Sequence, residues 1–492
     1  MWRALAAAAL ALACTGASAQ VIKVSPPRTI IDIDPHSPNA LLRESVLVQR
    51  QIFENLVRFE NNQPVGLLAE SWRQIDPKTW EFKLREGVTF HDGSTLDAAD
   101  VKASAERLSK ATGGMASLWK VLESVETPDA KTVVMKLKTP VGPFLRNVSF
   151  LAIAPSEAIA AKGATYGAGV VFPGTGPFKV GAFKPGDSLT VDRNDAYWGE
   201  KPKIDGVQFV NIPEQTARVT ALLNGEVDVA WSFPDDELKT LRGSKALKVD
   251  LVPSGIYSFA WFNSSRKPFT DKRVRQAMWH AIDLEKVIRD LIPETASVAR
   301  SPIPEGVFGW AAMKPYAYDP AKAKALLAEA GLPNGFRTSI LFGQNFMPGI
   351  ADIAQTFVSY WDAIGVKVTP MEQERAIFTK NFRELNWDMV LTSNPALTGD
   401  ADYTVGRLYL SSNNEMGYAN VALDALLLEA KQESDQAKRA EIYKKAIEMI
   451  WDDAVGIFWA DLKIVYVTRA DLTGLGFSPI EAPMFAKVAV GK

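Results

Sequence analysis

The sequence contains three histidines, His36, His91 and His280, the side chains best suited to proton transfer or metal binding near neutral pH. They lie far apart in the chain, and none has the two-histidine spacing of a known metal site. His280 falls in a predicted helix at 274–282, where a structural role is favoured. His91 falls in a predicted turn at 90–93. The sequence therefore predicts no metal site, no cofactor and no histidine-based catalytic centre.

Ser188 lies in a segment that matches a catalytic motif, because residues 186–189 read Gly-Asp-Ser-Leu, the nucleophile block of GDSL-type esterases. Those enzymes place the block near the mature N-terminus and pair it with a late Asp-x-x-His. The sequence contains no Asp-x-x-His, so Ser188 lacks its expected base. A turn at 184–187 followed by a strand at 189–191 is the favoured interpretation. A hydrolase that uses Ser188, or a glycosidase-like pair of carboxylates, stays open as the alternative.

The elements that must position any site alternate along the chain. Residues 80–84 and 132–138 are typical of half-buried strands, and a helix at 216–224 gives way to a strand at 227–230. Asp319 and Pro320 predict the start of a helix that ends at Gly331. Apolar residues at helical spacing predict two more helices, around 357–364 and 443–451. This mixed order predicts an α/β or α+β protein.

Length and charge limit the possible classes of protein. A chain of 492 residues exceeds what a single hydrophobic core usually supports, so two or three domains are expected. The formal net charge of -2 and the absence of a basic field argue against nucleic acid as a partner.

The N-terminal segment predicts export. Arg3 precedes an apolar run at 4–13, and Ala17-Ser18-Ala19 predicts cleavage before Gln20, so residues 1–19 are interpreted as a signal peptide and a periplasmic location is expected. Cys14, the single cysteine, offers the alternative of a lipoprotein, which the preceding residues fit poorly. Cleavage after Ala19 leaves a mature chain without cysteine, and therefore without disulfides.

Several segments share the pattern of one family, in the family's order. They begin with Phe53-Glu54-Asn55-Leu56 and Leu67 to Trp72, followed by a long stretch from Trp80 to Gly93. Further segments are Gly174 to Phe178, Tyr197-Trp198-Gly199, Leu222 to Asp228, Phe269 to Asp283, and Tyr318 to Gly331. Over nearly the whole mature chain the sequence resembles the family 5 extracellular solute-binding proteins, the peptide, nickel and opine group that serves bacterial ABC importers.

The resemblance implies an α/β fold of two hinge-linked lobes around a ligand cleft, the periplasmic-binding-protein fold with an extra subdomain. It implies a first-lobe core of 20–54, 171–262 and 475–492, an extra subdomain at 55–170 and a second lobe at 263–474. Crossings between the lobes are expected near Asn263 and Gly474. A ligand that touches both lobes favours the closed form, which a membrane permease then recognises.

The resemblance also limits the solute. Peptide-binding members hold the ligand's amino group with a carboxylate, and that position falls at Leu397 here, which argues against an ordinary peptide with a free amine. Asp400 and Asp402 lie just beyond it, with structural roles favoured. Residues 395–410 look closer to the glutathione-binding branch. Nickel-type members use a late histidine that this chain lacks, and opine-like solutes stay open.

Ten residues are candidate ligand contacts. Asp34 and His36 follow the first strand, where the family's first ligand loop lies. Phe259, Trp261 and Asn263 lie on the strand that approaches the expected hinge, although Phe259 and Trp261 fit a core equally well. Arg375 could hold a ligand carboxylate. Ser393, Asn394 and Pro395 end a late strand, and Leu397 follows it.

Overall fold

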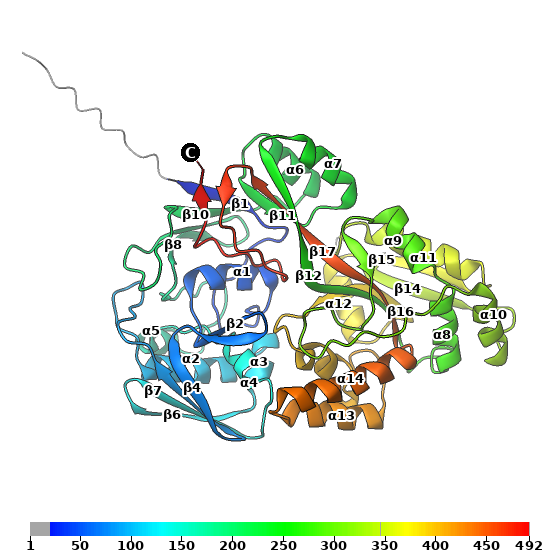
Figure 1. Ribbon diagram of the computed structural model, residues 1–492, viewed down its shortest axis with the longest axis horizontal. Coiled ribbons are helices and arrows are strands. Elements are labelled where there is room, and N and C mark those ends of the chain that lie inside the picture. Colours follow the sequence, from blue (N-terminus) through cyan, green and yellow to red (C-terminus); the bar gives the residue numbers. More distant parts are fainter. Residues whose placement is uncertain (1–19, 345, 492) are drawn as a thin grey trace, which may run out of the picture.

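One mixed β-sheet runs through both halves of the molecule (Figure 1). The computed structural model describes residues 20–344 and 346–491. The strands follow one another across the sheet as β15 (Lys367–Gln373), β14 (Arg337–Gly343), β16 (Met389–Pro395), β12 (Leu247–Phe262), β17 (Gly456–Arg469), β11 (Val229–Trp231), β1 (Val21–Ser25), β10 (Gly206–Val210), β9 (Ser188–Arg193) and β8 (Phe178–Lys184), with β13 (Ala296–Val298) paired to β17.

The long strands β12 and β17 join the two halves of this sheet. They pair antiparallel from Leu247↔Arg469 to Trp261↔Gly456, with register shifts between Pro253 and Tyr257 and after Ser258. The N-terminal part of β12 is partly exposed, whereas its last nine residues are all buried. Each strand therefore contributes side chains to two separate hydrophobic cores.

The cores divide the molecule into two lobes. The second lobe is built on a core drawn from residues 257–460. The first lobe is built on a core that combines residues 22–231 with residues 464–488, so both ends of the described chain lie in it. A smaller cluster packs α6 (Gln215–Leu223) and α7 (Asp235–Gly243) against β11 and β17.

The first lobe also carries a separate four-stranded antiparallel sheet, β4 (Ala69–Asp76), β5 (Thr79–Leu84), β7 (Thr132–Leu137) and β6 (Leu122–Asp129) in spatial order. Two separate two-stranded sheets are the hairpin of β2 (Val57–Glu60) with β3 (Gln63–Gly66), and the antiparallel pair of β18 (Leu472–Thr473) with β19 (Ala489–Val490). Its other helices are α1 (Arg43–Ile52), α2 (Ala98–Lys110), α3 (Gly114–Trp119), α4 (Phe144–Val148) and α5 (Ser156–Lys162).

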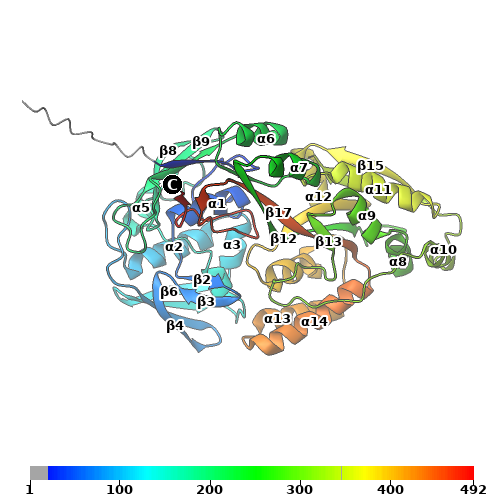
Figure 2. The same ribbon diagram turned by 45° about the horizontal axis from the view of Figure 1, so that its top comes forward.

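Helices surround the second half of the large sheet, and α13 and α14 face the N-terminal region (Figure 2). The helices of this lobe are α8 (Lys272–His280), α9 (Leu284–Leu291), α10 (Pro320–Glu329), α11 (Ile350–Asp362), α12 (Arg375–Arg383), a π-helix (Asp402–Gly406), a 3₁₀ turn (Ser411–Asn413), α13 (Val421–Gln432) and α14 (Gln436–Asp452). None of the helices in the described residues is long and apolar enough to cross a membrane.

Local signals placed most predicted elements correctly. Asp319 caps α10 by accepting a hydrogen bond from the amide of Lys322, as its position before Pro320 predicts. Phe357 and Trp361 are fully buried on α11, one helical turn apart. The strand predicted at 80–84 is β5, and the strand predicted at 189–191 is β9.

Candidate ligand-binding site

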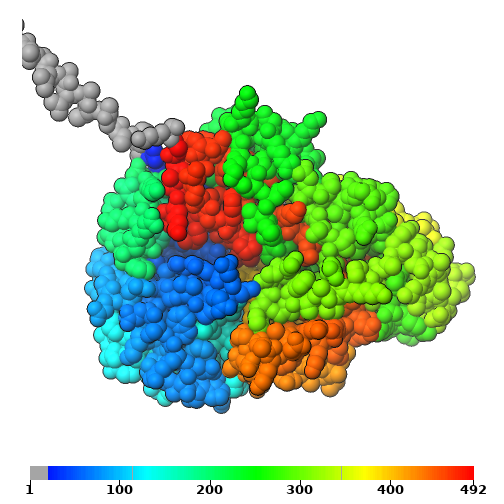
Figure 3. Space-filling view, in the orientation of Figure 1, coloured from blue at the N-terminus to red at the C-terminus, as the bar shows by residue number. Residues whose placement is uncertain are grey.

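A cavity of about 1160 Å³ lies between the two lobes. The first lobe lines it with α1, the β2–β3 hairpin, the segments 146–152 and 197–200, and the C-terminal segment 474–487. The second lobe contributes residues 305–307 and 396–399, and β12 contributes residues 253–255 at its irregular register. Around it the lobes meet closely, with N-terminal residues in blue against residues of the second lobe in orange (Figure 3). A cavity of this size holds a small organic molecule.

One face of α1 lines the cavity. Val46, Gln49, Arg50 and Phe53 fall at i, i+3, i+4 and i+7, which places them on one side of the helix. Most of the other residues of α1 are buried in the first-lobe core. The helix therefore presents one cation, Arg50, among apolar and amide side chains.

Of the cationic side chains that line the cavity from the first lobe, Arg146 is buried and Arg50 is half-buried, whereas Arg58 and Lys487 are exposed. Arg50 has no hydrogen-bond or ion-pair partner among residues 20–344 and 346–491, and burial lowers the pKa of its guanidinium. Arg146 Nη2 donates to Asn62 Oδ1 at 2.7 Å, and its guanidinium lies 3.7 Å from the ring centre of Phe59. Burial lowers the pKa of Arg146 to about 10. The exposed carboxylates of Glu60, Glu200 and Glu305 also line the cavity, so its preference for anions rests on the two guanidinium groups that are withdrawn from water.

Glu54, the buried carboxylate of this wall, forms hydrogen bonds within the first lobe. It accepts hydrogen bonds from Thr175 Oγ1 at 2.9 Å, Tyr197 Oη at 2.8 Å and Trp198 Nε1 at 2.7 Å. Burial raises its pKa despite these donors. The network connects the Phe53-Glu54-Asn55 segment with the Gly174 and Tyr197 segments, so these three family segments form one structural cluster.

The second lobe faces the cavity with the loop after β16. Leu397 is 6% exposed and packs into the core of the first lobe, across the boundary between the lobes. Its neighbour Thr398 is 5% exposed, lines the cavity, and has no hydrogen-bond partner for its hydroxyl among the described residues. The loop thus offers an apolar contact and one free hydroxyl, but no carboxylate, at the position expected for the amine anchor.

A second cationic group lies nearby. Glu481 accepts hydrogen bonds from Arg28, Arg43 and Ser232. Burial opposes its ionisation, but Arg43 and Arg28 outweigh burial and lower its pKa to about 2. Arg375, at the exposed start of α12 in the second lobe, is close enough to Arg43 to lower the pKa of Arg43 further. Two guanidinium groups, those of Arg28 and Arg43, therefore share the carboxylate of Glu481, and Arg375 of the second lobe lies near Arg43.

Asp34 and His36 lie in the core of the first lobe and do not line the cavity. Asp34 forms a bidentate pair with Arg107, at 2.8 and 2.9 Å. His36 Nε2 lies 2.9 Å from the carbonyl oxygen of Ala152, and burial lowers its pKa to about 4. Both side chains have internal structural roles.

Phe259, Trp261 and Asn263 are also buried away from the cavity. The rings of Phe259 and Trp261 stack with centroids 4.1 Å apart, in the core of the second lobe. Asn263 donates to the carbonyl oxygens of Leu385 and Trp387 at 3.2 and 3.0 Å. Of the two roles open to Phe259 and Trp261, the structure favours the core.

The remaining candidates lie at the end of β16 and beyond it. Ser393, Asn394 and Pro395 are half-buried and pair with β12 at Ser258, Tyr257 and Ile256. They precede the cavity-lining residues 396–399 without lining the cavity themselves. Of the ten candidates, Leu397 alone lines it.

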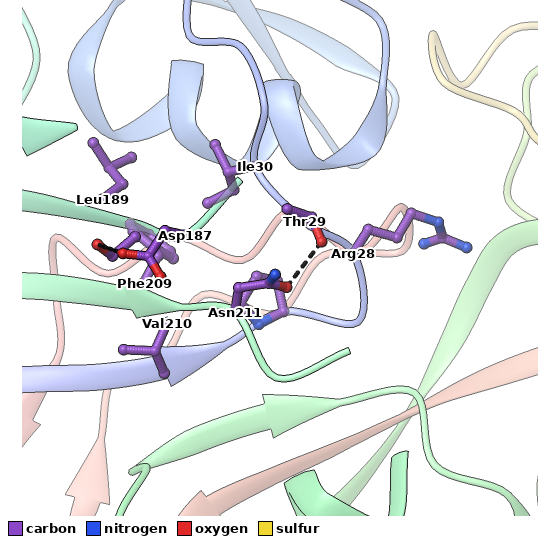
Figure 4. Close-up of a pocket in the computed structure, with 10 residues that line it drawn as sticks. Arg28, Thr29, Ile30, Asp187, Leu189, Phe209, Val210 and Asn211 are labelled. Atoms are coloured by element: carbon purple, nitrogen blue, oxygen red, sulfur yellow. Dashed lines mark hydrogen bonds between the residues drawn. The ribbon is translucent and has the colours of Figure 1, made fainter. Parts of the chain in front are cut away.

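Ser188 does not form a catalytic arrangement with any histidine. It lines a cavity of about 10 Å³, room for about one water molecule, together with Asp187 and Leu189 (Figure 4). A hydrogen bond from Thr29 to Asn211 crosses this region, and the side chain of Arg28 points away from it (Figure 4). Ser188 donates to Asp187, and the rings of His91 and His280 bind backbone carbonyls elsewhere. Within the described ranges, no group of three or more His, Cys, Asp or Glu could hold a metal ion.

Comparison with known proteins identifies the family of this two-lobed molecule. The family model of the bacterial extracellular solute-binding proteins, family 5, matches residues 63–416. The chain belongs to this family. It is 31% identical over 470 residues to the glutathione-binding protein GsiB of Pectobacterium atrosepticum, an alignment that covers 92% of this chain and 90% of the relative.

Solved structures of family members agree with the fold. The ABC transporter-associated periplasmic binding protein DppA from Helicobacter pylori, in complex with the peptide STSA, is 26% identical with a TM-score of 0.82, covering 96% of this chain and 98% of DppA. The binding protein AgaA from A. tumefaciens R10, in complex with agropinic acid, is 25% identical with a TM-score of 0.80, covering 96% and 99%. The predicted periplasmic-binding-protein fold is confirmed, and the chain is a solute-binding protein of the ABC importer type.

Sequence analysis missed the residues that line the cavity from the first lobe. Arg50 lies just before the segment that begins at Phe53, and Arg146 lies between two of the matched segments, far from either. The spacing of Val46, Gln49, Arg50 and Phe53 was the available signal, since it places a cation in a row of cavity-facing positions.

Proposed function

We propose that the protein captures a peptide-like organic anion, with glutathione as the leading solute, and delivers it to the permease of an ABC importer. The observation that carries this proposal is the cavity between the lobes, where neither Arg50 nor Arg146 forms an ion pair with a carboxylate of the described residues. The second-lobe loop lacks a carboxylate at Leu397. Similarity to glutathione-binding GsiB supports the same solute class.

Capture depends on closure around the solute. Because both lobes line the cavity, a solute that contacts both binds the closed form better than the open form and shifts the population toward closure. We propose that motion occurs where β12 and β17 pass between the lobes, at the irregular register of residues 253–257. The expected division into 20–54, 171–262 and 475–492, an extra subdomain at 55–170 and a second lobe at 263–474 stays a prediction.

We also propose that the protein performs no catalysis and acts in the periplasm. The relatives compared above are binding proteins, and Asp187 is the one acceptor of the Ser188 hydroxyl among the described residues. Residues 1–19, including Cys14, lie outside the described residues, so their role as a signal peptide is part of the proposal. Hydrolysis of generic ester or glycoside substrates that Ser188→Ala abolishes would contradict the claim that the protein is not an enzyme.

A thermal-shift screen of the purified protein tests the solute. It compares glutathione, di- and tripeptides, opines and nickel–histidine complexes. A ligand at about 100 times its dissociation constant should stabilise the fold by roughly 2.7 kcal/mol. A shift with glutathione or peptides supports the proposal. A shift confined to opines or to nickel complexes would replace the proposed solute while leaving the family assignment intact.

A further inference from the structure

Among the described residues, the half-buried Arg50 differs from the buried arginines because none of these residues accepts a hydrogen bond from its guanidinium. Buried guanidinium groups elsewhere are neutralised or hydrogen-bonded: Arg107 by Asp34, Arg439 by Asp400, Arg146 by Asn62, Arg218 by the carbonyls of Ile212 and Pro213, and Arg275 by those of Phe269 and Asp453. Arg50 is half-buried on the cavity-facing side of α1 without such a group. A cation withdrawn from water without a partner costs free energy, which a bound anion would recover.

In the second lobe, Thr398 brings a polar side chain to the cavity that Arg50 also lines. Its hydroxyl is withdrawn from solvent and has no hydrogen-bond partner among the described residues, although it lines the same cavity. An unpaired buried hydroxyl is uncommon in folded proteins and costs about 1–3 kcal/mol. Leu397 beside it already contacts the first-lobe core, so the loop that carries Thr398 is in its docked position.

We propose that Arg50 and Thr398 form a specificity-determining pair that binds one carboxylate of the solute from opposite lobes. The guanidinium of Arg50 donates to the carboxylate oxygens, and the hydroxyl of Thr398 donates to the same group from the docked loop. This inference rests on the proposed function and adds the subsite that recognises negative charge. It makes the wall of α1, and not the loop after β16, the main site of charge recognition.

The test compares charged and uncharged forms of one solute by isothermal titration calorimetry. Glutathione and glutathione diethyl ester differ in their carboxylates, and the peptide Ser-Thr-Ser-Ala and its C-terminal amide give a second pair. Arg50→Gln should weaken binding of the free acids at least about 30-fold, because a charge-assisted contact is lost. Its affinity for the ester and the amide should stay within about twofold of the wild type. Thr398→Val, which keeps the shape, should weaken the acids about 5- to 10-fold.

Arg73→Gln is the matched control. It removes the same charge from an exposed site on β4, where Arg73 is paired with Glu81, far from the cavity lining. It should leave all affinities unchanged. Equal losses for acids and esters in Arg50→Gln, or no loss at all, would overturn the proposal.

The melting temperature of the ligand-free protein tests the role of Arg50 independently of any solute. Arg50→Met should melt higher than the wild type, because an unpaired cation is replaced by an apolar side chain of similar length. A lower melting temperature would show that Arg50 supports the fold, and would overturn the proposal. If the wild type binds neither glutathione nor peptide, the proposed solute fails, and the melting comparison still decides the role of Arg50.

Discussion

Asp400 and Arg439 form a bidentate ion pair that is almost completely withdrawn from water, with Arg439 Nη1 donating to Asp400 Oδ2 at 2.7 Å. Arg439 lies on α14, and Asp400 follows directly on the cavity-lining residues 396–399. The pair therefore fixes the loop that carries Leu397 and Thr398 to the helices of the second lobe. The structural role expected for Asp400 is confirmed.

Asp400→Asn should destabilise the fold by about 3–5 kcal/mol in urea unfolding, because it leaves Arg439 buried without its counter-ion. Asp402→Asn is the control two residues away. Burial raises the pKa of Asp402, and no ion pair of its carboxylate occurs among the described residues, so its replacement should cost less than about 1 kcal/mol. Similar losses in the two variants would contradict the role of the pair.

Gly142→Ala should weaken solute binding without touching the cavity. The amide of Gly142, before α4, donates to the carbonyl oxygen of Lys431 in the second lobe at 2.8 Å. A Cβ at this position would overlap the carbonyl oxygen of Glu433, a backbone atom. Closure should therefore become less favourable, and the apparent dissociation constant should rise about tenfold or more.

Small-angle scattering and calorimetry check this prediction together. The ligand-free Gly142→Ala protein should have a larger radius of gyration than the wild type while its melting temperature changes little. Gly169→Ala is the control, since a Cβ there meets no atom within 4 Å. Unchanged affinity in Gly142→Ala would show that this contact does not contribute to closure.

Asp461→Asn should change how stability depends on pH. Asp461 lies on β17, and burial followed by the charge of Glu305 raises its pKa to about 7 from an ordinary 3.8. Below 3.8 both folded and unfolded states are protonated, so the carboxyl costs nothing. As pH rises from 3.8 to 7 the unfolded state ionises first, and the folded state loses stability, by roughly 2 kcal/mol above pH 7 after allowance for partial exposure.

Urea unfolding of wild type and Asp461→Asn at a series of pH values measures this difference. The variant should match the wild type near pH 4 and exceed it increasingly up to about pH 7, with a constant gain above. His36, whose pKa is lowered to about 4, makes the fold less stable as pH falls from 6.5 to 4, which is the opposite trend. Because both proteins contain His36, its contribution cancels in the difference between them. A gain that is the same at every pH would contradict the assignment to Asp461.

Glu481→Gln should make the fold less sensitive to acid. The ionised carboxylate of Glu481 stabilises Arg28 and Arg43, and this stabilisation is complete above its ordinary pKa of 4.5. It is lost as pH falls from 4.5 toward the folded-state value of about 2. The glutamine variant should be destabilised by roughly 2–4 kcal/mol at pH 7, and the gap should narrow below pH 4. Circular dichroism melts at pH 7 and pH 3 provide the measurement.

Local patterns predicted the elements well because caps, turns and apolar spacing act over a few residues. Asp319 with Pro320, and Phe357 with Trp361, show this for α10 and α11. The family resemblance supplied the two-lobed fold and the position of Leu397. These parts of the structure depend on signals that lie within one segment of the chain.

Contacts between side chains that lie far apart in the sequence could not be predicted. Asp34 was expected to meet a ligand because it follows the first strand, but it is neutralised by Arg107, 73 residues away. Whether Arg50 is paired depends on which carboxylates the fold brings to it, and no local pattern carries that information. The residues of the cavity wall could therefore be identified only from the three-dimensional arrangement of the two lobes.

The core of the first lobe has a consequence for how the chain is made. Phe485 packs edge to face against Phe209, and its amide donates to Gln51 on α1. The helix that carries Arg50 is thus backed by residues that a ribosome adds more than 430 positions later. During synthesis or export the first lobe must wait for the last part of the chain, while the second lobe, whose core ends at residue 460, can fold before it.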